Sequence, residues 1–113
     1  MRNVVLEALD RILDSGEEPD DVLRAAVVAL ADEPGHVWAG VAFLDQGTLV
    51  LGPTAGTPDE ARRLKVPILF QSSNVGELWV DGSADRALLE QVAQLLSGHV
   101  LIGWDTRGEA WDP

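Results

Sequence analysis

Glu77 and Trp79 are a pair of residues whose types and spacing suggest a binding site. They stand two positions apart in the apolar segment 75–80, so both side chains project from one face if that segment is a strand. A carboxylate beside an indole ring can bind a cationic group or a hydrogen-bonding ligand. In the alternative interpretation, Glu77 is simply solvated and Trp79 covers a neighbouring loop.

Arg62 and Arg63 are adjacent cations in the polar segment 54–63. In one interpretation they bind an anionic ligand. In the other they pair with carboxylates at the surface, where such pairs contribute only about 0–1 kcal/mol each. Together with Glu77 and Trp79, they complete the predicted set of ligand-binding residues.

The residue types that carry catalysis are scarce in this chain. It has no cysteine, which excludes thiol nucleophiles, disulfides and metal–thiolate sites. Its only histidines, His36 and His99, lack the spacing of a metal motif and are assigned structural or solvent-facing roles. The segment GPTAG at 52–56 lacks the Gly-Lys-Ser/Thr of a phosphate-binding loop and is interpreted as a turn. We therefore expect no enzyme activity, no metal ligand and no cofactor.

Composition narrows the class of protein further. The chain has 113 residues, which favours one domain, and a net charge of −11 from 19 acidic and 8 basic residues. So few cations disfavour nucleic acid and anionic membrane surfaces as partners. No signal peptide is visible, and no apolar run approaches the ~20 residues of a membrane helix. A cytoplasmic location is expected.

Hydrophobic periodicity indicates which elements position these residues. Apolar residues at helical spacing predict helices over 1–15, 19–31 and 84–102, the last with Ser83 as its N-cap. Between them, residues 36–81 are predicted to form a sheet, and residues 104–113 a C-terminal tail outside the domain 1–103. Trp38 shares a face with small and apolar neighbours in the first strand, so a core role is favoured over a ligand role.

Four strands are expected in that sheet, arranged as two hairpins. Val37–Leu44 is almost wholly apolar, as in a central strand covered on both faces. The return strand, Thr48–Gly52, is expected to end at Pro53, because proline cannot donate to a strand ladder. Pro67 inside the third strand, Leu64–Gln71, predicts an edge position for it.

The order of these segments resembles the GAF domain, a small sensory α/β fold, from about Asp20 to Ile102. The resemblance implies an α+β domain whose antiparallel four-stranded sheet has the order 2-1-4-3, with the N- and C-terminal helices packed on one face. The segments that carry it are DDVLRAAVVALA before the sheet, VWAGVAFLDQGTLVLGP and VPILFQSSNVGELWVDG as the two hairpins, and DRALLEQVAQLL as the closing helix.

Within that family, the first hairpin is also similar to the free methionine-(R)-sulfoxide reductases. Those enzymes use cysteine thiols carried between the two hairpins, where this chain has only TAGTPDEARRL. None of their catalytic residues can therefore be carried over. The resemblance also implies that this segment covers the ligand pocket, and residues 54–64 are too few to enclose a deep one.

These observations favour a non-enzymatic sensory or regulatory module that binds a small ligand or a protein partner. The alternative is a structural dimerisation module that has lost its pocket, and a remote alternative is a degenerate relative of the sulfoxide reductases. A homodimer through the terminal helices is expected, because the first helix carries more apolar residues than one stripe would need. Those residues are Val4, Val5, Leu6, Ala8, Leu9, Ile12 and Leu13.

Overall fold

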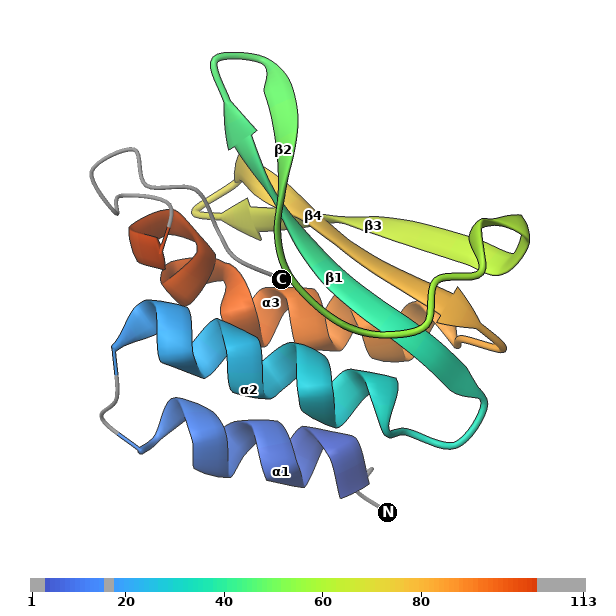
Figure 1. Cartoon of the computed structure of the whole chain (residues 1–113). Helices are drawn as coiled ribbons and strands as arrows, with labels where there is room; N and C mark the ends of the chain where they lie inside the picture. Colours follow the sequence, from blue (N-terminus) through green and yellow to red (C-terminus); the bar gives the residue numbers. More distant parts are fainter. Residues whose placement is uncertain (1–3, 16–17, 104–113) are drawn as a thin grey trace.

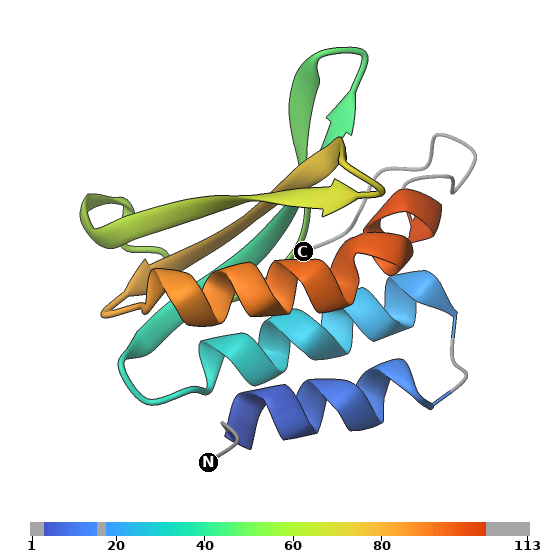
Figure 2. The same ribbon diagram turned by 180° about the vertical axis from the view of Figure 1, so that it is seen from behind.

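A computed structural model describes residues 4–15 and 18–103 of the chain. It shows one four-stranded sheet with all three helices on the same side (Figures 1 and 2). The elements are α1 (Val4–Leu13), α2 (Pro19–Ala31), β1 (His36–Asp45), β2 (Thr48–Gly56), the 3-10 turn η1 (Glu60–Arg62), β3 (Arg63–Phe70), β4 (Ser73–Gly82) and α3 (Arg86–Gly103).

The sheet is antiparallel throughout and has the order β2-β1-β4-β3, as the resemblance to GAF domains implied. The two hairpins are joined by pairing of β1 with β4, which makes these two the central strands. Residues facing each other across this junction include Gly40 with Trp79 and Ala42 with Glu77. The proline-containing strand β3 lies at an edge, which confirms the position inferred from Pro67.

The helices form two layers beneath the sheet. Helix α2 packs on β1 and β2, and α3 packs on β3 and β4. Helix α1 lies on the same side, against α2 and α3 (Figure 2). Within the described residues, no helix is long and apolar enough to span a membrane.

The core lies between the sheet and the helices, and it follows the period of the strands. Ala39, Val41 and Phe43 of β1 point to the helices, and so do Leu78 and Val80 of β4. Helix α1 supplies Val5 and Leu9, both fully or almost fully buried within the chain. The largest buried side chains in this cluster are Phe43, Leu9, Leu23, Leu30, Ile68, Leu78, Leu89 and Leu96.

The expectation that Pro53 ends the second strand is wrong. Gly40 pairs with Thr54, and Ala42 pairs with Leu51, so two residues of β2 lie opposite one residue of β1. This irregularity is a β-bulge, in which an extra residue is left out of the ladder. The bulge accommodates a residue without an N–H, so β2 continues to Gly56. The connection to β3 is therefore only residues 57–62.

The N-cap predicted for the last helix is also wrong. Helix α3 begins at Arg86, and the Asp85 carboxylate accepts a hydrogen bond from the Ala87 amide at 3.1 Å. Asp85 thus occupies the capping position that we assigned to Ser83. The helix passes through Gly98 without a break.

Candidate functional site

The face of the sheet turned away from the helices, here called the outer face, carries an unusual set of large polar and aromatic side chains. Strand β1 contributes Trp38, β3 contributes Arg63 and Lys65, and β4 contributes Glu77, Trp79 and Asp81. The register of β3 against β4 brings them together, because Arg63 pairs with Asp81 and Lys65 with Trp79.

Asp81 is fully buried and is the anchor of this face. Its Oδ1 accepts a hydrogen bond from Arg63 Nε at 2.8 Å, and its Oδ2 accepts one from Arg63 Nη2 at 3.0 Å. The backbone amide of Asp59 donates a third hydrogen bond to Oδ2, at 2.6 Å. A buried carboxylate with three donors, one pair of them from a guanidinium fork, fixes its neighbours in one geometry.

This arrangement shifts the pKa values of both partners. Burial of Asp81 opposes its charged form, but the hydrogen bonds from Arg63 and the Asp59 amide and the nearby positive charge outweigh it, so the pKa of Asp81 lies below its ordinary value. The hydrogen bond to Asp81 raises the pKa of Arg63. Both groups are therefore charged at neutral pH.

Cations and tryptophan rings alternate across the outer face. The Arg63 guanidinium carbon lies 4.4 Å from the Trp38 ring centroid and 5.3 Å from that of Trp79. Lys65 Nζ lies 4.2 Å from the Trp79 centroid. We call these four residues the tryptophan–cation stack. Each such contact contributes about 0.5–2 kcal/mol, with the larger values where the cation is desolvated.

Trp38 is the buried end of the stack. It is only 4% exposed, although it lies on the outer face and not in the helix-side cluster. A Cβ on Gly40 would come within 2.7 Å of its ring, so a residue without a side chain is needed there. The core role predicted for Trp38 is thus confirmed as burial, on the face opposite the helices.

The short connection after β2 is also tied to the sheet. The amide of Thr57 donates to the Val37 carbonyl at 2.8 Å, and Asp59 is bound to Asp81 through its amide. The same Asp81 carboxylate also binds Arg63, which contacts the ring of the buried Trp38. Trp79, Glu77 and Lys65 remain at least partly accessible beyond this connection.

The structure brings together three of the four predicted ligand-binding residues. Trp79 Nε1 donates a hydrogen bond to Glu77 Oε1 at 2.8 Å, and Arg63 lies beside the same ring. Arg62 is separate, because its Nε donates to Asp59 Oδ2 at 2.8 Å and its side chain is half exposed. Surface pairing, expected as the commoner outcome for both arginines, holds for Arg62. For Arg63 it holds only in part, because Nη1 lies 3.5 Å from the exposed Glu60 while the two shorter hydrogen bonds go to the buried Asp81.

Sequence reasoning did not select Lys65 or Asp81 for the site. Both could have been found from the period of two, since Asp81 follows Glu77 and Trp79 at the same spacing and Lys65 follows Arg63. Of the histidines, His36 is buried with Nδ1 2.8 Å from the Leu30 carbonyl oxygen, which is the structural role expected for it.

Comparison with known proteins identifies the fold. No protein-family model and no curated protein matches the sequence. Among solved structures, the GAF domain of the Acinetobacter phosphoenolpyruvate-protein phosphotransferase is similar with a TM-score of 0.71 and 18% identity, over 96% of this chain and 100% of that one. The GAF domain of the corresponding Coxiella burnetii protein has a TM-score of 0.70 and 13% identity, over 93% and 97%.

The free methionine-R-sulfoxide reductase from Neisseria meningitidis, solved in complex with its substrate, is similar as well. Its TM-score is 0.67 at 16% identity, over 89% of this chain and 92% of that one. These likenesses define an α+β domain with a central antiparallel sheet and helices on one side. The chain has the GAF fold, in a cysteine-free form.

Proposed function

We propose that this protein is a non-enzymatic regulatory GAF module that binds a small ligand on the outer face of its sheet. The observation that supports the proposal is the environment of Trp79. Both Arg63 and Lys65 contact its ring, its Nε1 donates a hydrogen bond to Glu77, and the side chain is still partly exposed. A ring held in this way loses little further freedom when a ligand packs against it, which favours binding.

The charges around Trp79 suggest the chemistry of that ligand. Lys65 already lies over the ring, so an added cation would have to compete with it. Lys65 can donate to an acidic or carbonyl group of a ligand, and Glu77 can accept from a donor group. We therefore favour a small hydrogen-bonding ligand with an acceptor and a donor on either side of an apolar part.

The short connection between β2 and β3 supports a shallow binding site. The connection between β2 and β3 has six residues, of which Thr57 and Asp59 donate hydrogen bonds to Val37 and Asp81, and Asp81 also binds Arg63, which contacts the buried Trp38. The sulfoxide reductase chemistry needs a thiol that this chain lacks. Recognition at the accessible end of the tryptophan–cation stack is the role that these residues fit.

A thermal-shift screen with nucleotides, amino acids and amino-acid S-oxides tests this proposal. A ligand that stabilises the protein should lose its effect in Trp79→Ala and weaken in Glu77→Gln. Glu90→Gln on α3 is the matched control, since Glu90 is exposed on the helical side and should leave the shift unchanged. If every stabilising compound acts equally on wild type and Trp79→Ala, the outer face is not the site.

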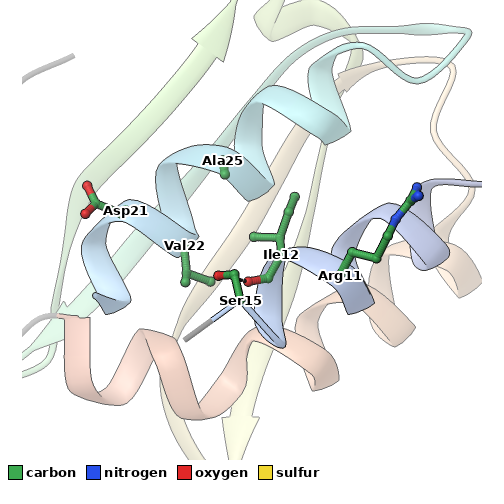
Figure 3. Close-up of a pocket in the computed structure, with 6 residues that line it drawn as sticks. All are labelled: Arg11, Ile12, Ser15, Asp21, Val22 and Ala25. Atoms are coloured by element: carbon green, nitrogen blue, oxygen red, sulfur yellow. Dashed lines mark hydrogen bonds between the residues drawn. The ribbon is translucent and has the colours of Figure 1, made fainter. Parts of the chain in front are cut away.

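The second candidate is a structural dimerisation module that uses the terminal helices. A groove of about 260 Å³ runs between α1 and α2, with Ile12, Val22 and Ala25 on its apolar side and Arg11 and Asp21 at its borders (Figure 3). Val28, two helical turns after Asp21 on α2, is 51% exposed.

Two of the α1 residues that were expected to form the homodimer interface do not face solvent. Val5 and Leu9 are buried inside the chain, so α1 has less uncovered surface than its sequence suggested. The helix-mediated homodimer therefore stays a prediction, as does the cytoplasmic location. Light scattering that shows a monomer at high concentration would remove the dimer.

A further inference from the structure

The two edges of the sheet differ in chemistry. Strand β3, at one edge, carries Arg63, Lys65 and Pro67, and charges and prolines are the usual devices that block pairing at an edge. Strand β2, at the other edge, has no charged residue from Thr48 to Gly56. Three consecutive large apolar residues in β2 are exposed: Leu49 (36%), Val50 (38%) and Leu51 (44%).

Leu49 lies on an arm that extends beyond the central strands, and Val50 and Leu51 lie at its base, opposite Phe43 and Ala42 of β1. Pairing of β1 with β4 ends where Phe43 meets Gly76, whereas pairing of β1 with β2 continues to Asp45 and Thr48. The β1–β2 hairpin accordingly projects past the other strands (Figures 1 and 2). Because side chains alternate, Leu49 and Leu51 share one face of the arm and Val50 takes the other.

We propose that Thr48–Gly52 pairs antiparallel with the same segment of a second copy of this chain, around a two-fold axis at Val50. Alternate residues of an edge strand direct their amide and carbonyl groups away from the sheet, ready to accept another strand. The pairing ends at Gly52, because the bulge and the missing N–H of Pro53 interrupt the ladder there.

The two edges of the sheet favour a second copy of this chain as the partner of β2. A chain whose two edges were both open could assemble head to tail into a fibre, but here the β3 edge is blocked. The remaining contact joins β2 to β2, which is self-complementary and closes as a dimer. Each copy has a net charge of −11, and this uncharged strand lets two copies meet without opposing like charges.

Sedimentation velocity on the full chain, over a range of concentrations, tests this interface. Wild type should be dimeric, and Val50→Lys should weaken the dimer at least about tenfold, because the axis sets two cations against each other. Leu69→Lys on β3, at 43% exposure, and Val28→Lys on α2 are the matched controls and should leave the dimer intact. Leu49→Lys repeats the test if Val50→Lys fails to fold.

Cysteine cross-linking then identifies the register. The chain has no cysteine, so single variants at Leu49, Val50 and Leu51 report only on themselves. Under oxidation, the position nearest the axis should form a covalent dimer, and Leu69→Cys should not. The proposal is overturned if wild type is a monomer, if Val28→Lys dissociates the dimer while Val50→Lys does not, or if none of the three variants cross-links. None of these outcomes depends on the proposed ligand site.

Discussion

The two faces of the sheet are built on different principles. The helix side buries aliphatic side chains and Phe43, which are stabilised by the apolar surface they remove from water and by close packing against each other. The outer face buries a carboxylate, a guanidinium and a tryptophan, which depend on particular partners. Apolar residues on the first face can be exchanged for others of similar volume, whereas a charged group on the second cannot lose its partner without a large penalty.

The largest effect is expected on the helix side. Phe43→Ala removes a fully buried ring from the centre of the core, and it should lower the free energy of unfolding by about 3–5 kcal/mol. Urea denaturation measures this. Leu69→Ala, at an exposed position of β3, should stay within about 0.5 kcal/mol of wild type. Equal losses in the two variants would contradict the boundaries of the core.

Asp81→Asn should produce the largest effect on the outer face. It leaves the largely buried Arg63 with only the exposed Glu60, 3.5 Å from its Nη1, as a countercharge, which we expect to cost about 3 kcal/mol at neutral pH. Glu90→Gln removes an exposed pair, Arg86 with Glu90 at 3.8 Å, and should change stability by less than about 0.5 kcal/mol. Similar losses in both variants would show that the buried pair of Arg63 and Asp81 contributes no more to the free energy of unfolding than an exposed pair.

The same pair predicts a pH dependence. The pKa of Asp81 is lower in the folded state than in the unfolded chain, so the pair's contribution is present above the ordinary carboxyl pKa and is lost as the pH falls through the folded value. Wild type should therefore lose more stability than Asp81→Asn on acidification below about pH 4. Urea titrations at neutral and acidic pH measure the difference, and parallel losses would contradict the assignment.

Gly40→Ala should have an intermediate effect on stability, and it tests how tightly Trp38 is packed on the outer face. The new methyl group would lie 2.7 Å from the Trp38 ring, which has Arg63 on one side, so the ring has to move. Overpacking of this kind costs about 1–3 kcal/mol. Thermal unfolding checks the loss, and near-UV circular dichroism should show a changed tryptophan signal. An unchanged signal would mean that the stack is looser than described.

The smallest expected effect is a gain on the helix side. Gly98 lies inside α3, and a Cβ there would make an ordinary contact with the Phe70 ring at 3.8 Å. Gly98→Ala should therefore stabilise the protein by about 0.5–1 kcal/mol through helix propensity. A thermal melt measures it, and a loss would indicate that the glycine serves another purpose.

The helix side is the face that sequence patterns predict well. A period of two marks Leu78 and Val80 as inward-facing, and apolar residues spaced near 3.6 define the helices, because burial follows from spacing there. The sheet order came from the resemblance to GAF domains. The strand end predicted at Pro53 was wrong because proline is also accommodated in edge strands and at bulges, and β2 is an edge strand with a bulge at that position.

The outer face was only partly predictable. Glu77 and Trp79 are two apart on one strand, so their neighbourhood could be inferred from one segment. The contact of Arg63 with Asp81 spans two strands and depends on their register, which a single sequence does not specify. Arg62 and Arg63 cannot be distinguished in the sequence. In the structure Arg62 is exposed to solvent, whereas Arg63 begins β3 and lies in the tryptophan–cation stack.

The claim that the outer face is the recognition surface is tested most directly by NMR titration of the labelled protein with the compounds that stabilise it. The account predicts that the Trp79 indole N–H resonance and the Lys65 and Glu77 amides shift together, while residues of the α1–α2 groove such as Ala25 do not. Shifts confined to that groove, with the Trp79 indole unmoved at saturation, would contradict it.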